Sequence, residues 1–91
     1  MSINGLPQTQ IIMYGTAWCG DCRRARRVLA ELNIPYTDID IDKDREAEAY
    51  VKQVNRGNRS VPTIVFPDGS TLTEPDSFTL AERLKMYQPT A

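Results

Sequence analysis

Strand-type and helix-type patterns alternate along this 91-residue chain, and their order is compatible with few topologies. An apolar, β-branched run at 10–14 precedes an amphipathic helix that we expect to end near Asn33. A strand at 36–41 leads to a second helix, which starts near Asp44 and is stopped by the sequence NRGN at 55–58. Strands at 63–66 and 70–73 flank a Pro-Asp-Gly turn, and a last helix starts at about Asp76.

This βαβαββα order predicts an α/β fold, with a four-stranded mixed sheet flanked by three helices. The first βαβ unit should place its strands parallel with a right-handed crossover, and the last two strands should form an antiparallel hairpin. Ligand sites in such sheets favour the carboxyl ends of the parallel strands, where the loop GTAWCGDC at 15–22 lies. The length suits one domain, 1–91, whose ends at 1–9 and 88–91 we expect to be flexible.

Charge and composition exclude several classes of function. The formal net charge of −1 argues against a general nucleic-acid or membrane binder. The sequence shows no signal pattern and no apolar run of about 20 residues, so we expect a cytoplasmic protein. In that compartment a cysteine pair is more often catalytic or metal-binding than structural. The absence of histidine excludes Cys-His proteases and His-ligated metal sites.

Cys19 and Cys22 stand in C-x-x-C spacing at the first turn of the predicted helix. The unpaired backbone N–H groups and the positive end of the helix dipole favour the thiolate of Cys19, which is the nucleophilic form. Spacing i, i+3 places Cys22 within disulfide reach, and its position on the apolar stripe predicts that it is the more buried cysteine. An exposed thiolate backed by a buried thiol is suited to nucleophilic attack followed by resolution.

Other uses of two cysteines fit the sequence less well. Structural zinc takes about four ligands, and two cysteines without histidine leave only carboxylates, so we assign no metal site. A metal or iron–sulfur cluster shared across a dimer and inert core thiols stay open as alternatives. A phosphatase-type thiolate would need an arginine six residues further on, where the chain has Ala25 and Val28.

Three motifs together resemble the glutaredoxins over about 11–84: WCGDC after a strand, VPT at 61–63 and DGSTLTEPD at 68–76. Within that family, the phrases GNRSVPT and LTEPDS are most similar to the mycoredoxin-type proteins of bacteria that use thiols other than glutathione. The resemblance implies a thioredoxin-like fold and a dithiol–disulfide oxidoreductase, with Cys19 as nucleophile and Cys22 as resolving cysteine. It also implies that Val61–Pro62 is the family's cis-proline site, whose backbone pairs with an extended thiol substrate.

The same resemblance and the position of the side chains suggest a substrate-binding set, which comprises Trp18, Gly20, Asp21, Val61, Pro62, Glu74 and Asp76. Arg23 or Arg24 would modulate the Cys19 thiolate, although a run of arginines on a helix is usually a solvated face. The carboxylate of Asp21 would oppose the thiolate, and it would also suit the positive end of the helix dipole.

Departures from the family pattern bear on the co-substrate. Thr16 stands in place of a lysine that contacts glutathione, and Thr73-Glu74 replaces a Gly-Gly pair. We therefore expect weak attraction of glutathione, although Arg59 is placed to hold a carboxylate or sugar hydroxyl. No tightly bound cofactor is predicted; the co-substrate is a low-molecular-weight thiol, namely mycothiol, bacillithiol or glutathione.

The expected partners are oxidised or S-thiolated proteins and a flavoprotein disulfide reductase, and the protein is expected to be a monomer that serves cell redox homeostasis. Two other functions stay open. One is a thioredoxin-like hydrogen donor that a flavoprotein reductase reduces directly. The other is a metal or iron–sulfur cluster-binding module.

Overall fold

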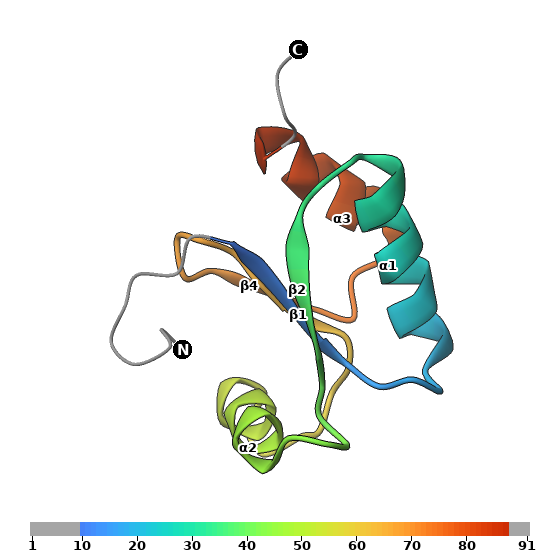
Figure 1. The fold of residues 1–91 in the computed structure, drawn as a ribbon. Helices are drawn as coiled ribbons and strands as arrows, with labels where there is room; N and C mark the ends of the chain where they lie inside the picture. Colours follow the sequence, from blue (N-terminus) through green and yellow to red (C-terminus); the bar gives the residue numbers. More distant parts are fainter. Residues whose placement is uncertain (1–9, 88–91) are drawn as a thin grey trace.

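The chain folds in the βαβαββα order that its sequence patterns predict (Figure 1). The structure, a computed structural model, describes residues 10–87, so the predicted flexible ends lie outside the described residues. The elements are β1 (Ile11–Gly15), α1 (Gly20–Glu31), β2 (Tyr36–Asp40), α2 (Arg45–Val54), β3 (Thr63–Val65), β4 (Thr71–Thr73), α3 (Ser77–Leu84) and a final 3₁₀ turn, η2 (Lys85–Tyr87).

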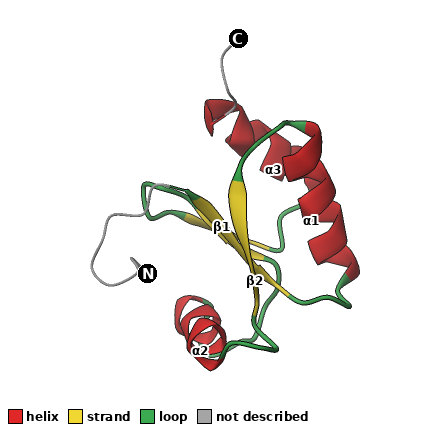
Figure 2. Cartoon of the chain, in the orientation of Figure 1, coloured by secondary structure: helices red, strands yellow, loops and turns green. Residues whose placement is uncertain are grey.

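The four strands, drawn in yellow in Figure 2, form one mixed sheet, and their order in it is β2-β1-β3-β4. β1 and β2 are parallel, with Ile11 opposite Tyr36 and Gly15 opposite Asp40. β3 runs antiparallel to both β1 and β4, which confirms the predicted mixed sheet and its C-terminal hairpin. β1 is thus a central strand, and the loop that leaves its carboxyl end leads to Cys19, the N-cap of α1, and to Cys22 in the first turn of that helix.

The sheet separates two hydrophobic clusters, because α1 and α3 cover one face and α2 covers the other (Figure 1). Side chains alternate along a strand, so Met13 packs on the α1 and α3 side while its neighbours Ile12 and Tyr14 pack on the α2 side. The first cluster consists of Ile11, Met13, Cys22, Ala25, Leu29, Ile34, Ile64, Phe66, Leu80 and Leu84. The second consists of Ile12, Tyr14, Ile41, Ala47, Val51 and Val65.

Side-chain caps fix where two of the helices begin. Asp44 caps α2 and accepts the backbone N–H of Ala47 at 3.0 Å, and Asp76 caps α3 and accepts that of Thr79 at 2.7 Å. The helix that follows the first strand ends at Glu31, two residues before its predicted end, because the chain then turns through Asn33. Asn33 has φ of 56°, and asparagine is among the residues that accept this left-handed region most readily.

The two short strands differ from their predicted bounds by one residue each. The predicted strand at 63–66 ends at Val65, and the one at 70–73 begins at Thr71. Phe66 and Ser70 instead close the turn, since the Phe66 N–H donates to the Ser70 carbonyl at 2.9 Å and the Gly69 N–H donates to the Phe66 carbonyl at 2.8 Å.

Candidate functional site

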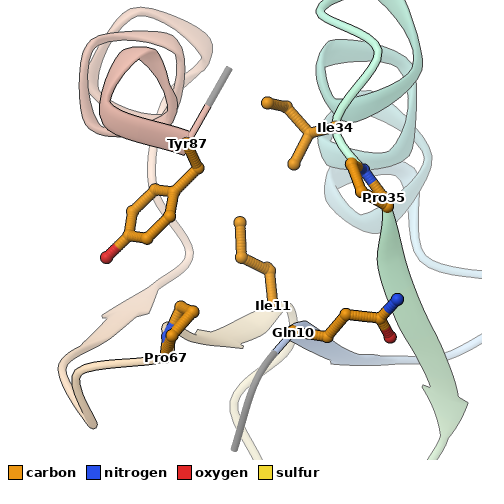
Figure 3. Close-up of a pocket in the computed structure, with 6 residues that line it drawn as sticks. All are labelled: Gln10, Ile11, Ile34, Pro35, Pro67 and Tyr87. Carbon is orange, nitrogen blue, oxygen red and sulfur yellow. The ribbon is translucent and has the colours of Figure 1, made fainter. Parts of the chain in front are cut away.

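A small pocket lies at the start of β1, away from the cysteines (Figure 3). It is lined by Gln10, Ile11, Ile34, Pro35, Pro67 and Tyr87. β1 runs from this pocket to the loop that carries the cysteines, so the two places are at opposite ends of the strand. The lining side chains include no thiol, carboxylate or cation.

The two cysteines differ in exposure, as the helical stripe predicts. Cys19 is half-buried and Cys22 is fully buried, and both are free thiols. Cys19 is the N-cap residue of α1, and its sulfur accepts the backbone N–H of Cys22 at 3.2 Å. A thiol thus occupies the position where an N-cap usually places a hydroxyl or carboxylate oxygen. The helix N-terminus therefore provides a hydrogen-bond donor to the Cys19 sulfur.

The loop before β3 approaches the same sulfur. The Val61–Pro62 peptide bond is cis, as the resemblance implies, and the Cys19 thiol lies 3.9 Å from the carbonyl oxygen of Val61. The backbone N–H of Glu74 donates to the carbonyl of Pro62 at 2.8 Å, so the chain after β4 joins the same place. Three segments that are distant in sequence thus meet around Cys19.

Burial dominates the chemistry of Cys22. Burial and a hydrogen bond with Cys19 raise the pKa of Cys22 to about 12, while the backbone N–H of Thr16 and the charge of Arg26 act in the opposite direction. The sulfur also packs tightly against β1, because a Cβ added at Gly15 would lie only 2.9 Å from it. Cys22 is therefore a protonated thiol near neutral pH, held against the backbone of the central strand.

Arg26 is the arginine of α1 that reaches this centre, which the sequence reasoning missed. Its Nε donates to the Asp38 carboxylate on β2 at 2.6 Å, and its Nη2 donates to the Thr16 carbonyl at 3.2 Å. The bond to Asp38 is the main reason why the pKa of Arg26 is raised. One signal was available: Arg26 stands four residues after Cys22, so the two side chains lie on neighbouring turns of one helix flank.

The first turn of α1 carries the acid that separates the cysteines. The exposed carboxylate of Asp21 pairs with Arg24, which is also exposed. Arg23 is exposed as well. Arg24 is thus held by Asp21, and the expected modulation of Cys19 by Arg23 or Arg24 stays a prediction.

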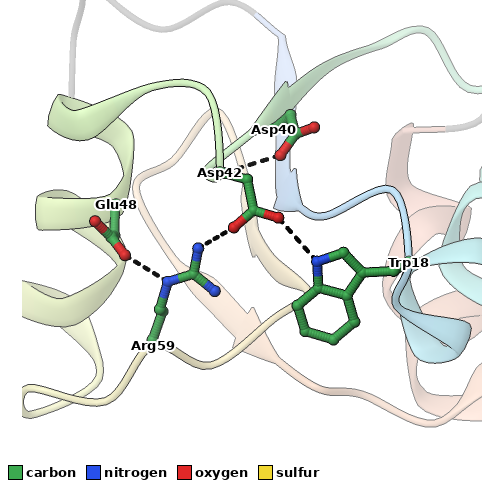
Figure 4. A network of polar contacts seen from close by, with 5 residues as sticks. All are labelled: Trp18, Asp40, Asp42, Glu48 and Arg59. Atoms are coloured by element: carbon green, nitrogen blue, oxygen red, sulfur yellow. Dashed lines mark hydrogen bonds and ion pairs between the residues drawn. The ribbon is translucent and has the colours of Figure 1, made fainter.

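Trp18 is exposed and is held by a polar network (Figure 4). Its indole N–H donates to the carboxylate of Asp42 at 2.8 Å, and Asp42 in turn pairs with Arg59. Arg59 also pairs with Glu48 on α2. The hydrogen bonds from Arg59 are the main cause of the lowered pKa of both carboxyls, Asp42 and Glu48. Arg59 is therefore not free for a substrate carboxylate, contrary to the expectation from its place beside Val61.

The remaining residues that the sequence analysis singled out differ in their exposure and in their contacts. Glu74 is exposed with φ of 49°, a left-handed conformation that is uncommon for glutamate. Asp76 is exposed, but its carboxylate caps α3, and the backbone N–H of Thr79, followed by the Thr79 hydroxyl, is the first cause of its lowered pKa. A Cβ added at Gly20 would meet no atom within 4 Å, so its surroundings are open. Thr16 is fully buried, and its hydroxyl has no hydrogen-bond partner within residues 10–87.

Metal-binding clusters and membrane-spanning helices are both absent from the part of the chain that the structure describes. Within residues 10–87, no three His, Cys, Asp or Glu side chains are grouped so that they would hold a metal ion. Over the same range, no helix is both long enough and apolar enough to cross a membrane.

Comparison with known proteins points to one family. The family model for glutaredoxin matches residues 11–70. A protein of Mycobacterium tuberculosis (strain H37Rv) described as a glutaredoxin is 46% identical over 67 residues, which cover 74% of this chain and 80% of that protein. Mycoredoxin 1 of Corynebacterium glutamicum is 42% identical over 67 residues, covering 74% of this chain and 82% of that protein.

A solved structure has the same fold. The solution structure of glutaredoxin from Brucella melitensis superposes with a TM-score of 0.67 at 22% identity, covering 90% of this chain and 88% of that one. At that identity the likeness shows the fold alone, while the family model and the curated relatives identify the family. With Cys19 and Cys22 together at the start of α1, this chain belongs to the glutaredoxin family of thiol–disulfide oxidoreductases.

Proposed function

We propose that the protein reduces mixed disulfides and disulfides of oxidised proteins, with Cys19 as the nucleophile and Cys22 as the resolving cysteine. The observation that carries this proposal is the unequal placement of the two sulfurs. The Cys19 sulfur is accessible and accepts the Cys22 N–H at 3.2 Å at a helix N-terminus, whereas Cys22 is fully buried. A thiolate that forms at Cys19 gains from that donor and from the helix dipole, so attack begins there.

The reaction takes place in two thiol–disulfide exchanges. In the first, the Cys19 thiolate attacks the sulfur of the small thiol in an S-thiolated protein. The disulfide bond of the substrate breaks, the protein thiolate leaves, and the small thiol is now bound to Cys19. In the second, either another small thiol or Cys22 attacks this adduct. Attack by Cys22 releases the small thiol and leaves a Cys19–Cys22 disulfide, which a reductant must then reduce.

The backbone beside Cys19 supports a polypeptide or thiol substrate in extended conformation. The Val61 carbonyl lies 3.9 Å from the Cys19 thiol, on the approach to the sulfur. A bound chain that pairs with the Val61 backbone would bring its own sulfur to Cys19. Gly20 leaves open space beside this approach, and Trp18, Asp21, Glu74 and Asp76 stand exposed as contact side chains.

The electron donor is a low-molecular-weight thiol other than glutathione, of which mycothiol is the one that the mycoredoxin resemblance implies and bacillithiol the next candidate. Members of the glutaredoxin family generally use a low-molecular-weight thiol as co-substrate. Glutathione is anionic, and the position of the expected lysine is filled by the fully buried Thr16. Glu74 adds an exposed carboxylate, and Arg59 is occupied by Asp42 and Glu48. The site thus offers glutathione little positive charge.

The protein acts in the cytoplasm as a monomer on oxidised or S-thiolated proteins, and a flavoprotein disulfide reductase regenerates its small thiol. Its formal net charge of −1 supports the absence of a nucleic-acid or membrane partner.

Two serine variants test the division of labour between the cysteines. Cys19→Ser should abolish disulfide reduction. Cys22→Ser should retain reaction with a small-thiol mixed disulfide and accumulate an adduct of one thiol on Cys19, visible by intact-mass spectrometry. An inactive Cys22→Ser beside an active Cys19→Ser would show that the two roles are reversed.

A parallel assay tests the donor. Glutathione, mycothiol and bacillithiol, each with its own reductase, and thioredoxin reductase alone are offered to the reduced protein with one S-thiolated substrate. We expect turnover with mycothiol or bacillithiol and poor turnover with glutathione. Turnover of about 10 per second with glutathione would contradict the donor assignment. Turnover with thioredoxin reductase alone would indicate a thioredoxin-like hydrogen donor, and a coloured, cysteine-dependent species would indicate a cluster-binding module.

A further inference from the structure

We infer that Arg26 is a positioning residue for the second exchange: its guanidinium stabilises the thiolate of Cys22 and so speeds release of the thiol bound to Cys19. This inference rests on the proposed roles of the two cysteines. It assigns a function to one particular arginine of the run at 23–27 that the sequence pattern treats as a solvated face.

The geometry places the guanidinium and the buried sulfur next to the same backbone position. A Cβ added at Gly15 would lie 2.9 Å from the Cys22 sulfur and 3.4 Å from Nη2 of Arg26. Both atoms therefore border the same point at the carboxyl end of β1. A cation so close to a thiol favours the ionised form of that thiol, and the effect is larger where water is excluded.

Arg26 is fixed in this place from two sides. Asp38, on the neighbouring strand β2, accepts its Nε at 2.6 Å, and the carbonyl of Thr16 accepts its Nη2 at 3.2 Å. The side chain is only 25% exposed, so it is shielded from solvent better than Arg24, whose side chain is 56% exposed. Because the guanidinium is already ordered, no conformational entropy must be spent to bring its charge near the sulfur.

Within residues 10–87, Arg26 is the one cation among the groups that act on the ionisation of Cys22. Along α1, Cys19 hydrogen-bonds to Cys22 and disfavours its ionisation. The backbone N–H of Thr16 favours it, from the loop after β1. From β2, the phenol of Tyr36 packs against the same cluster, and the carboxylate of Asp38 is paired with Arg26. The phenol of Tyr87, on η2, belongs to this cluster but lines the pocket at the other end of β1. The β3 and α3 residues of the cluster are apolar, and they comprise Ile64, Leu80 and Leu84.

The second exchange requires Cys22 to ionise. Its thiol gives a proton to water, and the resulting thiolate attacks the sulfur of Cys19. The bond from Cys19 to the small thiol breaks, and the small thiol leaves as a thiolate that takes up a proton. The two cysteines lose two electrons in total, and the substrate disulfide gains them. Because burial opposes ionisation of Cys22, a nearby cation lowers the barrier of this step and leaves the first attack by Cys19 unaffected.

The test separates the two exchanges by stopped flow. The reduced protein is mixed with a symmetrical aromatic disulfide whose released thiolate absorbs visible light. Attack by Cys19 releases one coloured thiolate, and resolution by Cys22 releases a second. Arg26→Gln removes the charge, Arg26→Lys keeps it, and Arg27→Gln is the matched control, because Arg27 is exposed on the same helix.

We expect Arg26→Gln to slow the second release about tenfold, equivalent to one pKa unit, and to leave the first release within twofold of wild type. In wild type the second rate should rise about tenfold per pH unit between pH 6 and 9, and Arg26→Gln should move this profile about one unit towards high pH. Arg26→Lys should recover most of the rate, and Arg27→Gln should match wild type.

Each contrary result has a distinct meaning. A second release that is equally fast in Arg26→Gln and Arg27→Gln would overturn the inference. So would an equal loss of rate in Arg26→Gln and Arg26→Lys, since a loss that the retained charge does not rescue would be a packing effect, which urea unfolding of the same variants reports independently. If wild type shows no second release at all, or if the first release survives Cys19→Ser, then the proposed roles of the cysteines fail instead.

Discussion

Gly15→Ala is the substitution whose cost the structure defines most sharply. The new methyl group would lie 2.9 Å from the Cys22 sulfur, 3.2 Å from Cε of Met13 and 3.4 Å from Nη2 of Arg26. The flexible end of Met13 can move aside. The Cys22 sulfur cannot do so easily, because it is bonded to the Cβ of a fully buried residue of α1. Overpacking of this kind costs about 1–3 kcal/mol. For a domain of this size, each kcal/mol lowers the melting temperature by about 4–8 °C.

A second glycine provides the control. At Gly20, in the first turn of α1, an added Cβ would meet no atom within 4 Å. Alanine is favoured over glycine within a helix by up to about 1 kcal/mol, so Gly20→Ala should leave stability unchanged or raise it. Urea unfolding of the reduced proteins, followed by circular dichroism, gives the free energy of unfolding of both variants. We expect a difference of at least about 1 kcal/mol between them, in favour of Gly20→Ala.

A double-mutant cycle assigns the cost to the sulfur. Cys22→Ala removes the closest contact of the new methyl group, so Gly15→Ala should cost less than half as much in that background. Equal cost in both backgrounds would refute the claim that the Cys22 sulfur limits the space at Gly15. Gly15→Ala with wild-type stability would refute the packing argument altogether.

Two further predictions concern carboxylates. Asp44→Ala removes the cap of α2 and should lower the free energy of unfolding by about 0.5–2 kcal/mol; an unchanged urea midpoint would contradict this. Asp42 has its pKa lowered from 3.8, first by Arg59 and then by Trp18, so the contacts of its carboxylate stabilise the fold at neutral pH and are lost only as pH falls through that lowered pKa. The fluorescence of Trp18, the single tryptophan, should therefore change with a midpoint below pH 3.8, and Asp42→Asn should abolish this transition.

Local signals made the fold and the cysteines predictable. The order of elements follows from periodicity, and Asp44 is a cap residue directly before an amphipathic run. The burial of Cys22 follows from its place on the apolar stripe of α1. Each of these inferences uses residues within one helical turn of one another, where propensity and periodicity determine the structure.

Long-range polar contacts were not predictable in this way. Trp18 and Asp42 are 24 residues apart, and Arg59 comes from a third segment, so no local pattern links them. Asp38 and Arg26 meet because β2, which is parallel to β1, lies beside α1. Helical periodicity could not single out Arg26, since it predicted every arginine of α1 to be solvated. Glu74 adopts positive φ although glutamate has no local preference for it, because the chain after β4 is bonded to the Pro62 carbonyl.

Because the sheet divides the core into two clusters, local unfolding on one face does not expose both cysteines to oxidation. Within residues 10–87, the cluster on the α1 and α3 side contains ten buried residues and the one under α2 contains six. Opening of the α2 side therefore exposes less apolar surface and is the less costly local unfolding event. Such opening uncovers Val51 and leaves Cys22 covered by the other layer. Irreversible oxidation by peroxide, which requires an accessible thiolate, is thereby restricted to Cys19 during these fluctuations, and the resolving thiol is preserved.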